Sequence, residues 1–125
     1  VVKEYRPRWT ADRDYIIKKV RVTAGNHDST THPDDGAPRG DDLVIQLFKY
    51  PVTWDDDTGS RVRVFNNEGR LRIPAGKHRD TAWAEDIKDT AESFLEDEWL
   101  TVKVSQIGST YAGDSIVVTV VLEPA

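Results

Sequence analysis

The feature that most constrains the fold is an apolar alternation between residues 99 and 122. Leu100, Val102 and Val104 alternate with polar residues, a period of two that places one row of side chains in a core and the other in water. A second strand with an inward apolar row is expected further along, formed by Ile116, Val118, Val120 and Leu122. A loop built around Gly108 and Gly113 joins the two strands, which together predict an all-β or nearly all-β domain.

Two further strands are expected earlier in the chain, at residues 15–22 and 43–49. In the first, Ile16, Val20 and Val22 share one face, so this face should be buried. The second is mostly apolar on both faces. Such a strand is typical of burial on both sides or of an oligomer contact.

A hairpin is predicted in the middle of the chain. Residues 61–65 and 70–73 each alternate arginine with apolar side chains. They flank residues 66–69, which read Asn-Asn-Glu-Gly, a plausible hairpin loop.

Residues 80–98 allow two interpretations. Apolar residues recur there at helix-like spacing, at Trp83, Ile87, Ala91, Phe94 and Leu95. A helix over residues 83–96 is the local interpretation, and a strand through position 83 followed by one helical turn around 91–95 is the alternative. We expect a short helical segment near residues 88–97 and leave the conformation of residues 83–87 open.

Length and composition place these elements in one domain. At 125 residues the chain fits a single domain, expected as an antiparallel β-sandwich over residues 10–125. Residues 1–9 are expected as an extended N-terminal arm, because Pro7 disfavours a helix there. The net charge of −5 argues against general nucleic-acid binding, which needs clustered cations. No apolar run approaches the length of a membrane span.

The chain shows no catalytic or metal-binding motif. Residues 55–59 begin like a calcium loop, but the position that should carry a bidentate Glu is Asn66, so an acidic turn is the favoured interpretation. Acidic pairs at 34–35 and 41–42 are interpreted as solvated loop charge. His27, His32 and His78 lack the spacing of a zinc site. We therefore expect no cofactor, no metal and no enzymatic activity.

The four tryptophans are candidates either for the core or for a contact with a partner. Trp83 and Trp99 are expected in the core. Trp9 and Trp54 lie near the ends of predicted elements, where a tryptophan often anchors a contact with a partner.

Several stretches in order along the chain resemble a known family. They are residues 10–25 (TADRDYIIKKVRVTAG), 40–47 (GDDLVIQL), 73–76 (IPAG), 99–110 (WLTVKVSQIGST) and 112–120 (AGDSIVVTV). In this order and spacing the chain is similar to a tailed-bacteriophage virion domain, found in minor tail proteins, tail-fibre heads and capsid-decoration proteins. The resemblance runs from about Trp9 to Leu122, and the charged segment 91–98 and the acidic loop 26–42 depart from it.

The resemblance implies a jelly-roll-like β-sandwich and a structural role in the virion, which assembles in the host cytoplasm. It implies no catalytic residues. We expect a capsid decoration or cement protein, assembling as a homotrimer on the major capsid protein or on other virion proteins. A minor tail or fibre-head protein is the alternative, and so is a carbohydrate-binding module that contacts a host surface glycan. The expected interaction residues are Tyr5, Arg6 and Trp9 in the arm, with Trp54 and Tyr111 as the glycan candidates.

Overall fold

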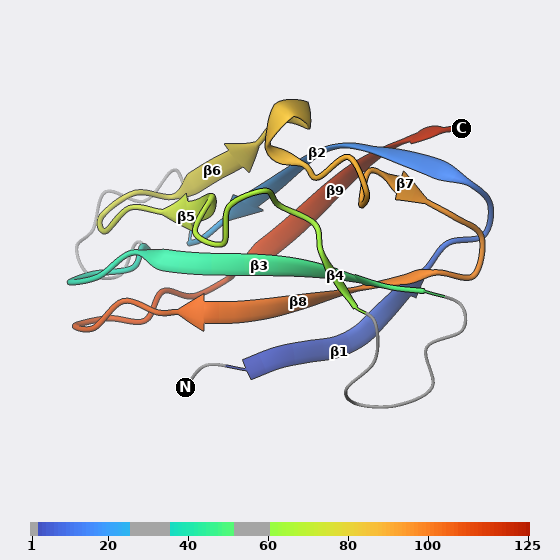
Figure 1. Cartoon of the computed structure of the whole chain (residues 1–125). Helices are drawn as coiled ribbons and strands as arrows, with labels where there is room; N and C mark the ends of the chain where they lie inside the picture. Colours follow the sequence, from blue (N-terminus) through green and yellow to red (C-terminus); the bar gives the residue numbers. More distant parts are fainter. Residues whose placement is uncertain (1–2, 26–35, 52–60) are drawn as a thin grey trace.

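The protein is a sandwich of two antiparallel β-sheets (Figure 1). This computed structural model describes residues 3–25, 36–51 and 61–125, and describes side chains from Trp9 onward. The first sheet, sheet A, contains β1 (Lys3–Thr10), β3 (Leu43–Tyr50), β4 (Val62–Arg63), β5 (Leu71–Ile73) and β8 (Trp99–Gln106). The second, sheet B, contains β2 (Tyr15–Thr23), β6 (Arg79–Ala82), β7 (Ser93–Phe94) and β9 (Val117–Pro124). The predicted all-β sandwich is confirmed.

The chain winds back and forth between the sheets. Sheet A runs in the order β1-β8-β3, with β4 and β5 both on the far edge of β3. In sheet B, β2 pairs with β9 on one side and with β6 and β7 on the other. Successive strands therefore change sheet between β1 and β2, β2 and β3, β5 and β6, β7 and β8, and β8 and β9. These crossings place the two antiparallel sheets face to face, as in a β-sandwich.

The core lies between the sheets and is built from the predicted alternating rows. Leu100 and Val104 of β8 are buried, and Val118, Val120 and Leu122 of the second row pack against the same core. Ile116, expected in that row, precedes β9 and is 37 % exposed, so its inward position is wrong. Strand β3 is buried on both faces along its whole length, as its sequence predicts.

On the outer face of β3, aromatic side chains form a second, smaller cluster. The Tyr50 ring stacks on Trp99 with centroids 4.0 Å apart, and the Arg61 guanidinium lies 4.0 Å from the Phe48 centroid. Such stacking and cation–π contacts stabilise a sheet face beyond the burial of area alone.

A β-bulge changes the face of β2 that is buried. The β2–β9 register shifts between Ile17 and Lys19, so Ile17, not Ile16, is buried together with Val20 and Val22. The extra residue, Lys18, is exposed and its Nζ lies 3.7 Å from Glu123. A strict period of two does not anticipate a bulge, because one inserted residue inverts the alternation.

The predicted hairpin at residues 61–73 is wrong. Strands β4 and β5 do not pair with each other; each pairs with β3, at Phe48–Lys49 and at Leu43–Ile45 respectively. The segment between them leaves the edge of β3 so that Val64 and Phe65 enter the core. Phe65 there forms a bridge with Ile87. A turn still closes at residues 67–70, where the Arg70 N–H donates to the Asn67 carbonyl over 3.2 Å, but the strands on either side of it do not form a hairpin.

The helical segment predicted near residues 88–97 is also wrong. The one helical element among the described residues is a 3-10 turn at Ala84–Asp86, η1. Residues 88–92 form turns, and the chain then enters β7, where Phe94 is fully buried and pairs with Tyr15 of β2. Tertiary burial overrides the local helix propensity of this alanine- and glutamate-rich segment.

The expected N-terminal arm is part of the sandwich. Residues 3–10 are extended, but they form β1 and pair with β8 from Lys3–Val104 to Thr10–Trp99. Without β1, the backbone groups on this edge of β8 would lack strand partners. The extended conformation expected for residues 1–9 is thus seen from Lys3 onward, in a strand that pairs with β8 of the same chain.

Candidate functional site

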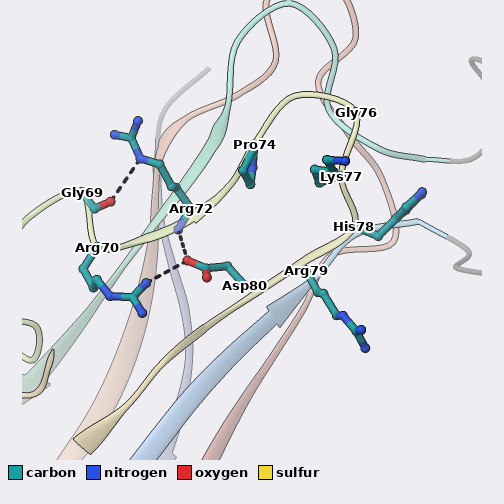
Figure 2. A pocket seen from close by; sticks show the side chains of 9 residues that line it. All are labelled: Gly69, Arg70, Arg72, Pro74, Gly76, Lys77, His78, Arg79 and Asp80. Atoms are coloured by element: carbon teal, nitrogen blue, oxygen red, sulfur yellow. Dashed lines mark hydrogen bonds and ion pairs between the residues drawn. The ribbon is translucent and has the colours of Figure 1, made fainter. Parts of the chain in front are cut away.

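The most prominent concave feature of the described surface is a basic groove beside the turn between β5 and β6. It has a volume of about 930 Å³. Its lining, shown in Figure 2, consists of Gly69, Arg70, Arg72, Pro74, Gly76, Lys77, His78, Arg79 and Asp80. Four of these nine residues are arginine or lysine and a fifth is histidine, in a chain whose net charge is −5. The groove is thus a local concentration of positive charge.

A tight turn shapes one end of the groove. The Lys77 backbone N–H donates to the Pro74 carbonyl over 2.9 Å, and Gly76 between them has φ +83°. A positive-φ glycine at the third position is what a type II turn requires. The Asp42 carboxylate accepts the Ala75 N–H over 3.0 Å and so holds the turn to the start of β3.

Two of the groove's arginines are held by carboxylates. Arg70 Nη1 lies 3.0 Å from Asp80 Oδ2 and Arg70 Nε lies 3.0 Å from Asp86 Oδ2. Arg72 Nη1 lies 3.1 Å from Asp42 Oδ2. These ion pairs form the floor of the groove, so the two guanidinium groups serve chiefly to hold the structure in place.

Lys77 and Arg79 are different, because both side chains are exposed and neither makes a hydrogen bond or ion pair with another described residue. In Figure 2 the Arg79 side chain extends away from Arg70 and Asp80. His78 lies between them and its Nδ1–H donates to the Ala24 carbonyl over 2.8 Å. This arrangement suits electrostatic contact with carboxylates or other anions on a partner surface.

The polar groups that line the groove are mostly engaged within the fold. The lining contains no serine, threonine or cysteine. Its single carboxylate, Asp80, accepts hydrogen bonds from Arg70 and from the Arg72 backbone N–H, and its one imidazole, His78, is bonded through Nδ1 to the Ala24 carbonyl. Lys77 and Arg79 are therefore the charged groups of the lining that remain exposed for contact with a partner.

The groove has no motif of its own in the sequence. Residues 73–76 belong to one of the family-like stretches, and no recognisable pattern marks the Lys-His-Arg run at 77–79. A compositional signal is nevertheless present: Arg70 and Arg72 occupy alternate positions of one strand, and three basic or titratable residues follow within seven positions. Topology, which places β5 beside β6, was needed to bring the two groups together.

The predicted interaction residues are not brought together at one site. Tyr5 and Arg6 lie in β1, where the backbone of Tyr5 pairs with Val102. Trp54 lies outside the described residues. Trp9, 46 % exposed, packs its ring 5.3 Å from that of Phe94.

The remaining glycan candidate, Tyr111, is half-buried at a backbone crossing. It forms a bridge with Arg39, and its hydroxyl donates to the Asp114 carboxylate. A Cβ at Gly108 would lie 2.0 Å from the Tyr111 carbonyl oxygen and 2.7 Å from the Arg39 nitrogen. Position 108, in the middle of the Gln-Ile-Gly-Ser-Thr stretch, therefore requires glycine, since only glycine allows this close approach of the backbones.

Two tryptophans differ from one another in burial. Trp99 is buried, as predicted, whereas Trp83 is 48 % exposed, so its expected core position is wrong. Lys19 Nζ lies 5.2 Å from the centroid of the Trp83 ring, and this cation–π contact covers one face of the ring.

Metal binding finds no support in the described part of the chain, where no group of three or more metal-ligating side chains occurs. Asp42, one of the considered acidic pair at 41–42, instead binds Arg72 and the Ala75 N–H. The calcium-like stretch 55–59, the acidic pair 34–35, His27 and His32 lie outside the described residues.

The ionisation of Tyr15 is perturbed by its contact with Asp12. Its hydroxyl donates to Asp12 Oδ1. This hydrogen bond, helped by partial desolvation, raises the pKa of Tyr15 above its usual value of 10.0. Tyr15 also lies beside Trp9, with ring centroids 6.1 Å apart, so it belongs to an aromatic contact at the end of β2 and not to the groove.

Comparison with known proteins gives no match: no family model matches the chain, and neither the curated proteins nor the solved structures contain a significant relative. None of the helical segments in the described residues is long and apolar enough to cross a membrane.

Proposed function

We propose that the protein is a non-enzymatic structural component of a tailed-phage virion, most simply a capsid decoration protein that docks on other virion proteins. The observation that carries the proposal is that some cations of the groove are held in ion pairs whereas others are exposed. Asp42, Asp80 and Asp86 hold Arg70 and Arg72, whereas the neighbouring cations Lys77 and Arg79 are left exposed. The order of family-like stretches along the chain supports the same proposal.

The basic groove is the proposed docking surface. Lys77 and Arg79 present two cations on either side of His78, and an acidic patch on a capsid or tail protein would complement them. This assignment replaces docking through the N-terminal arm, because residues 3–10 are already paired with β8. Docking through the groove leaves the sandwich intact.

The location in the particle tests the proposal. An antibody raised against the protein should label purified particles of the phage that encodes it, on the capsid for a decoration protein and on the tail for a minor tail or fibre-head protein. Mass spectrometry of the same particles should detect the chain. Its absence from purified particles, with the protein found only in the infected-cell lysate, would refute the proposal.

The docking surface has its own test. The double variant Lys77→Glu/Arg79→Glu should lose binding to particles that lack the protein, whereas Lys103→Glu, a charge reversal on β8, should retain it. Because exposed charges are screened by salt, binding of the unmodified protein should weaken as the salt concentration rises. Equal binding by both variants would remove the groove from the proposal. Trimeric assembly on the particle, which the resemblance implies, stays a prediction that counting the copies at each attachment site on imaged particles tests.

A further inference from the structure

The free edge of sheet B is the second unexplained surface of the molecule. Strand β9 pairs with β2 from Val117–Thr23 to Pro124–Tyr15, and no strand among the described residues pairs with its other edge. Figure 1 shows β9 at the border of its sheet, beyond β2. An unpaired edge presents a row of backbone donors and acceptors to which another strand can add.

Most of this edge lacks the features that usually prevent strand addition. From Ile116 to Leu122 there is neither a charged residue nor a proline; Glu123 and Pro124 come only at the end of β9. Three large apolar side chains are exposed here: Ile116 at 37 %, Val117 at 55 % and Val121 at 36 %. The free edge of sheet A differs, because β1 carries four charged residues and Pro7 within eight positions. Charges and proline protect an edge, so β1 is protected along its length, whereas β9 is protected only at its C-terminal end.

The sequence of β9 is self-complementary. Residues 116–122 read Ile-Val-Val-Thr-Val-Val-Leu, which is a palindrome about Thr119 apart from the exchange of isoleucine for leucine at its ends. A two-fold contact brings the same surface patch of two copies together, and for a strand edge this means antiparallel pairing. With Thr119 opposite its own copy, Val118 would face the partner's Val120 and Val117 would face the partner's Val121.

Such pairing preserves the two faces of the sheet. Val118, Val120 and Leu122 pack against the core, so in the joined sheet the two inward rows would meet as one continuous apolar row. Val117, Thr119 and Val121 would form the corresponding outer row. Cross-strand pairs of β-branched residues are among those that stabilise antiparallel sheets.

An apolar seam between the sheets lies beside the same edge. One slot, of about 240 Å³, is lined by Trp9, Leu47, Leu100, Val102, Val118 and Val120. A second, of about 450 Å³, is lined by Val102, Val104, Ile116 and Val118. Both slots include inward residues of β9, so a copy added to this edge would shield apolar surface that a monomer exposes to water.

We propose that two copies of this chain associate through β9, in an antiparallel two-fold contact centred on Thr119 that joins their B sheets into one. The proposal is independent of the virion role. Particle labelling tests the role, whereas the association of the free protein tests the contact.

Disulfide cross-linking tests the contact and its register, because the chain has no cysteine. Directly opposed residues in an antiparallel pair have Cα atoms about 4.5–5.5 Å apart, within the range of a disulfide. Thr119→Cys should therefore form a covalent dimer under mild oxidation. Val117→Cys and Val121→Cys should cross-link with each other when mixed, and much less when each is alone. Thr90→Cys, in an exposed turn, is the matched control and should stay largely monomeric.

Sedimentation of the protein without cysteines gives the second measurement. The unmodified chain should show a concentration-dependent monomer–dimer equilibrium. Thr119→Lys, which would oppose two like charges at the two-fold axis, should shift it towards monomer by about tenfold or more at unchanged melting temperature. A monomer at every concentration up to the millimolar range, a trimer, or cross-linking of position 119 no faster than of position 90 would overturn the proposal.

Discussion

A buried lysine joins the two sheets at one end of the sandwich. Lys49 lies on the inward side of β3 with its side chain only 8 % exposed. Its Nζ donates to the carbonyl of Ser93 in β7 and lies 3.6 Å from Glu98 Oε1. Glu98 is itself 11 % exposed and accepts the Leu95 N–H over 2.7 Å. The ammonium group thus satisfies acceptors that come from sheet B and from the approach to β8.

Replacement of this lysine by methionine, Lys49→Met, should destabilise the fold severely. The unbranched apolar stem is kept, but the Glu98 carboxylate loses its cation and the Ser93 carbonyl loses its donor. Removal of one partner from a buried ion pair costs about 3–5 kcal/mol. Because Glu98 lies near the rim and keeps the Leu95 N–H, we expect a loss of about 3 kcal/mol. With a urea slope of roughly 1.5 kcal/mol/M, the unfolding midpoint should fall by about 2 M.

Urea unfolding followed by tryptophan fluorescence measures this loss, and the double variant Lys49→Met/Glu98→Gln is its control. The amide side chain placed at position 98 carries no charge and keeps an acceptor for the Leu95 N–H, so the double variant should be more stable than Lys49→Met by roughly 2 kcal/mol. A loss below about 1 kcal/mol, or a double variant no more stable than the single one, would show that the buried charge is not compensated by this contact.

Three further perturbations have defined outcomes. Gly108→Ala should lower the free energy of unfolding by about 3 kcal/mol, because the added methyl meets backbone atoms that cannot move aside; a loss below about 1 kcal/mol in urea unfolding would contradict the crossing geometry. Arg70→Ala should cost about 2 kcal/mol in the same assay by removing two partly exposed ion pairs and a 2.7 Å hydrogen bond to the Thr81 carbonyl, whereas an unchanged midpoint would mean that the groove floor is not held by this side chain. Because the pKa of Tyr15 is raised by its bond to Asp12, the stabilisation from this bond is complete below the unfolded-state pKa of 10.0 and is lost as the pH rises through the higher folded-state value. Tyr15→Phe should therefore show a smaller alkaline loss of stability than the unmodified protein, and equal losses would contradict this.

The sequence predicts the sheets better than the connections between them. The rows at Leu100–Val104 and Val118–Leu122 are set by alternation alone, because a strand with one buried face has only one favourable register. The uninterrupted burial of β3 likewise follows from its two apolar faces. These features depend on local composition, which is what a single sequence contains.

The errors occur where distant contacts decide the conformation. The bulge at Lys18 depends on the register with β9, at the other end of the chain. Strands β4 and β5 pair with β3 and not with each other, since Phe65 between them is buried beside Ile87. Phe94 enters a strand for the same reason, although its neighbours favour a helix. No local pattern contains this information, because each case is decided by the partner strand.

The roles of the charged residues in the groove likewise depend on distant contacts that the local sequence does not contain. Its cations are visible in the sequence as Arg70, Arg72 and the run 77–79, but their roles are not. Carboxylates from three different segments, Asp42, Asp80 and Asp86, determine which arginines are held. Only the fold separates the structural cations from the exposed ones.

The groove and the β9 edge lie at opposite borders of sheet B, and this has a consequence for binding. Strand β6, which contributes Arg79 to the groove, is separated from β9 by β2 alone. A two-fold axis between paired β9 strands runs through the joined sheet, so both copies turn the same face outward. At about 4.8 Å between neighbouring strands, the two β6 strands would lie roughly 24 Å apart. A dimer formed through β9 would then offer two basic grooves to one acidic surface, and bivalent attachment strengthens binding without any new contact. The edge contact and the groove, which bind different partners, would thus reinforce each other in one assembly.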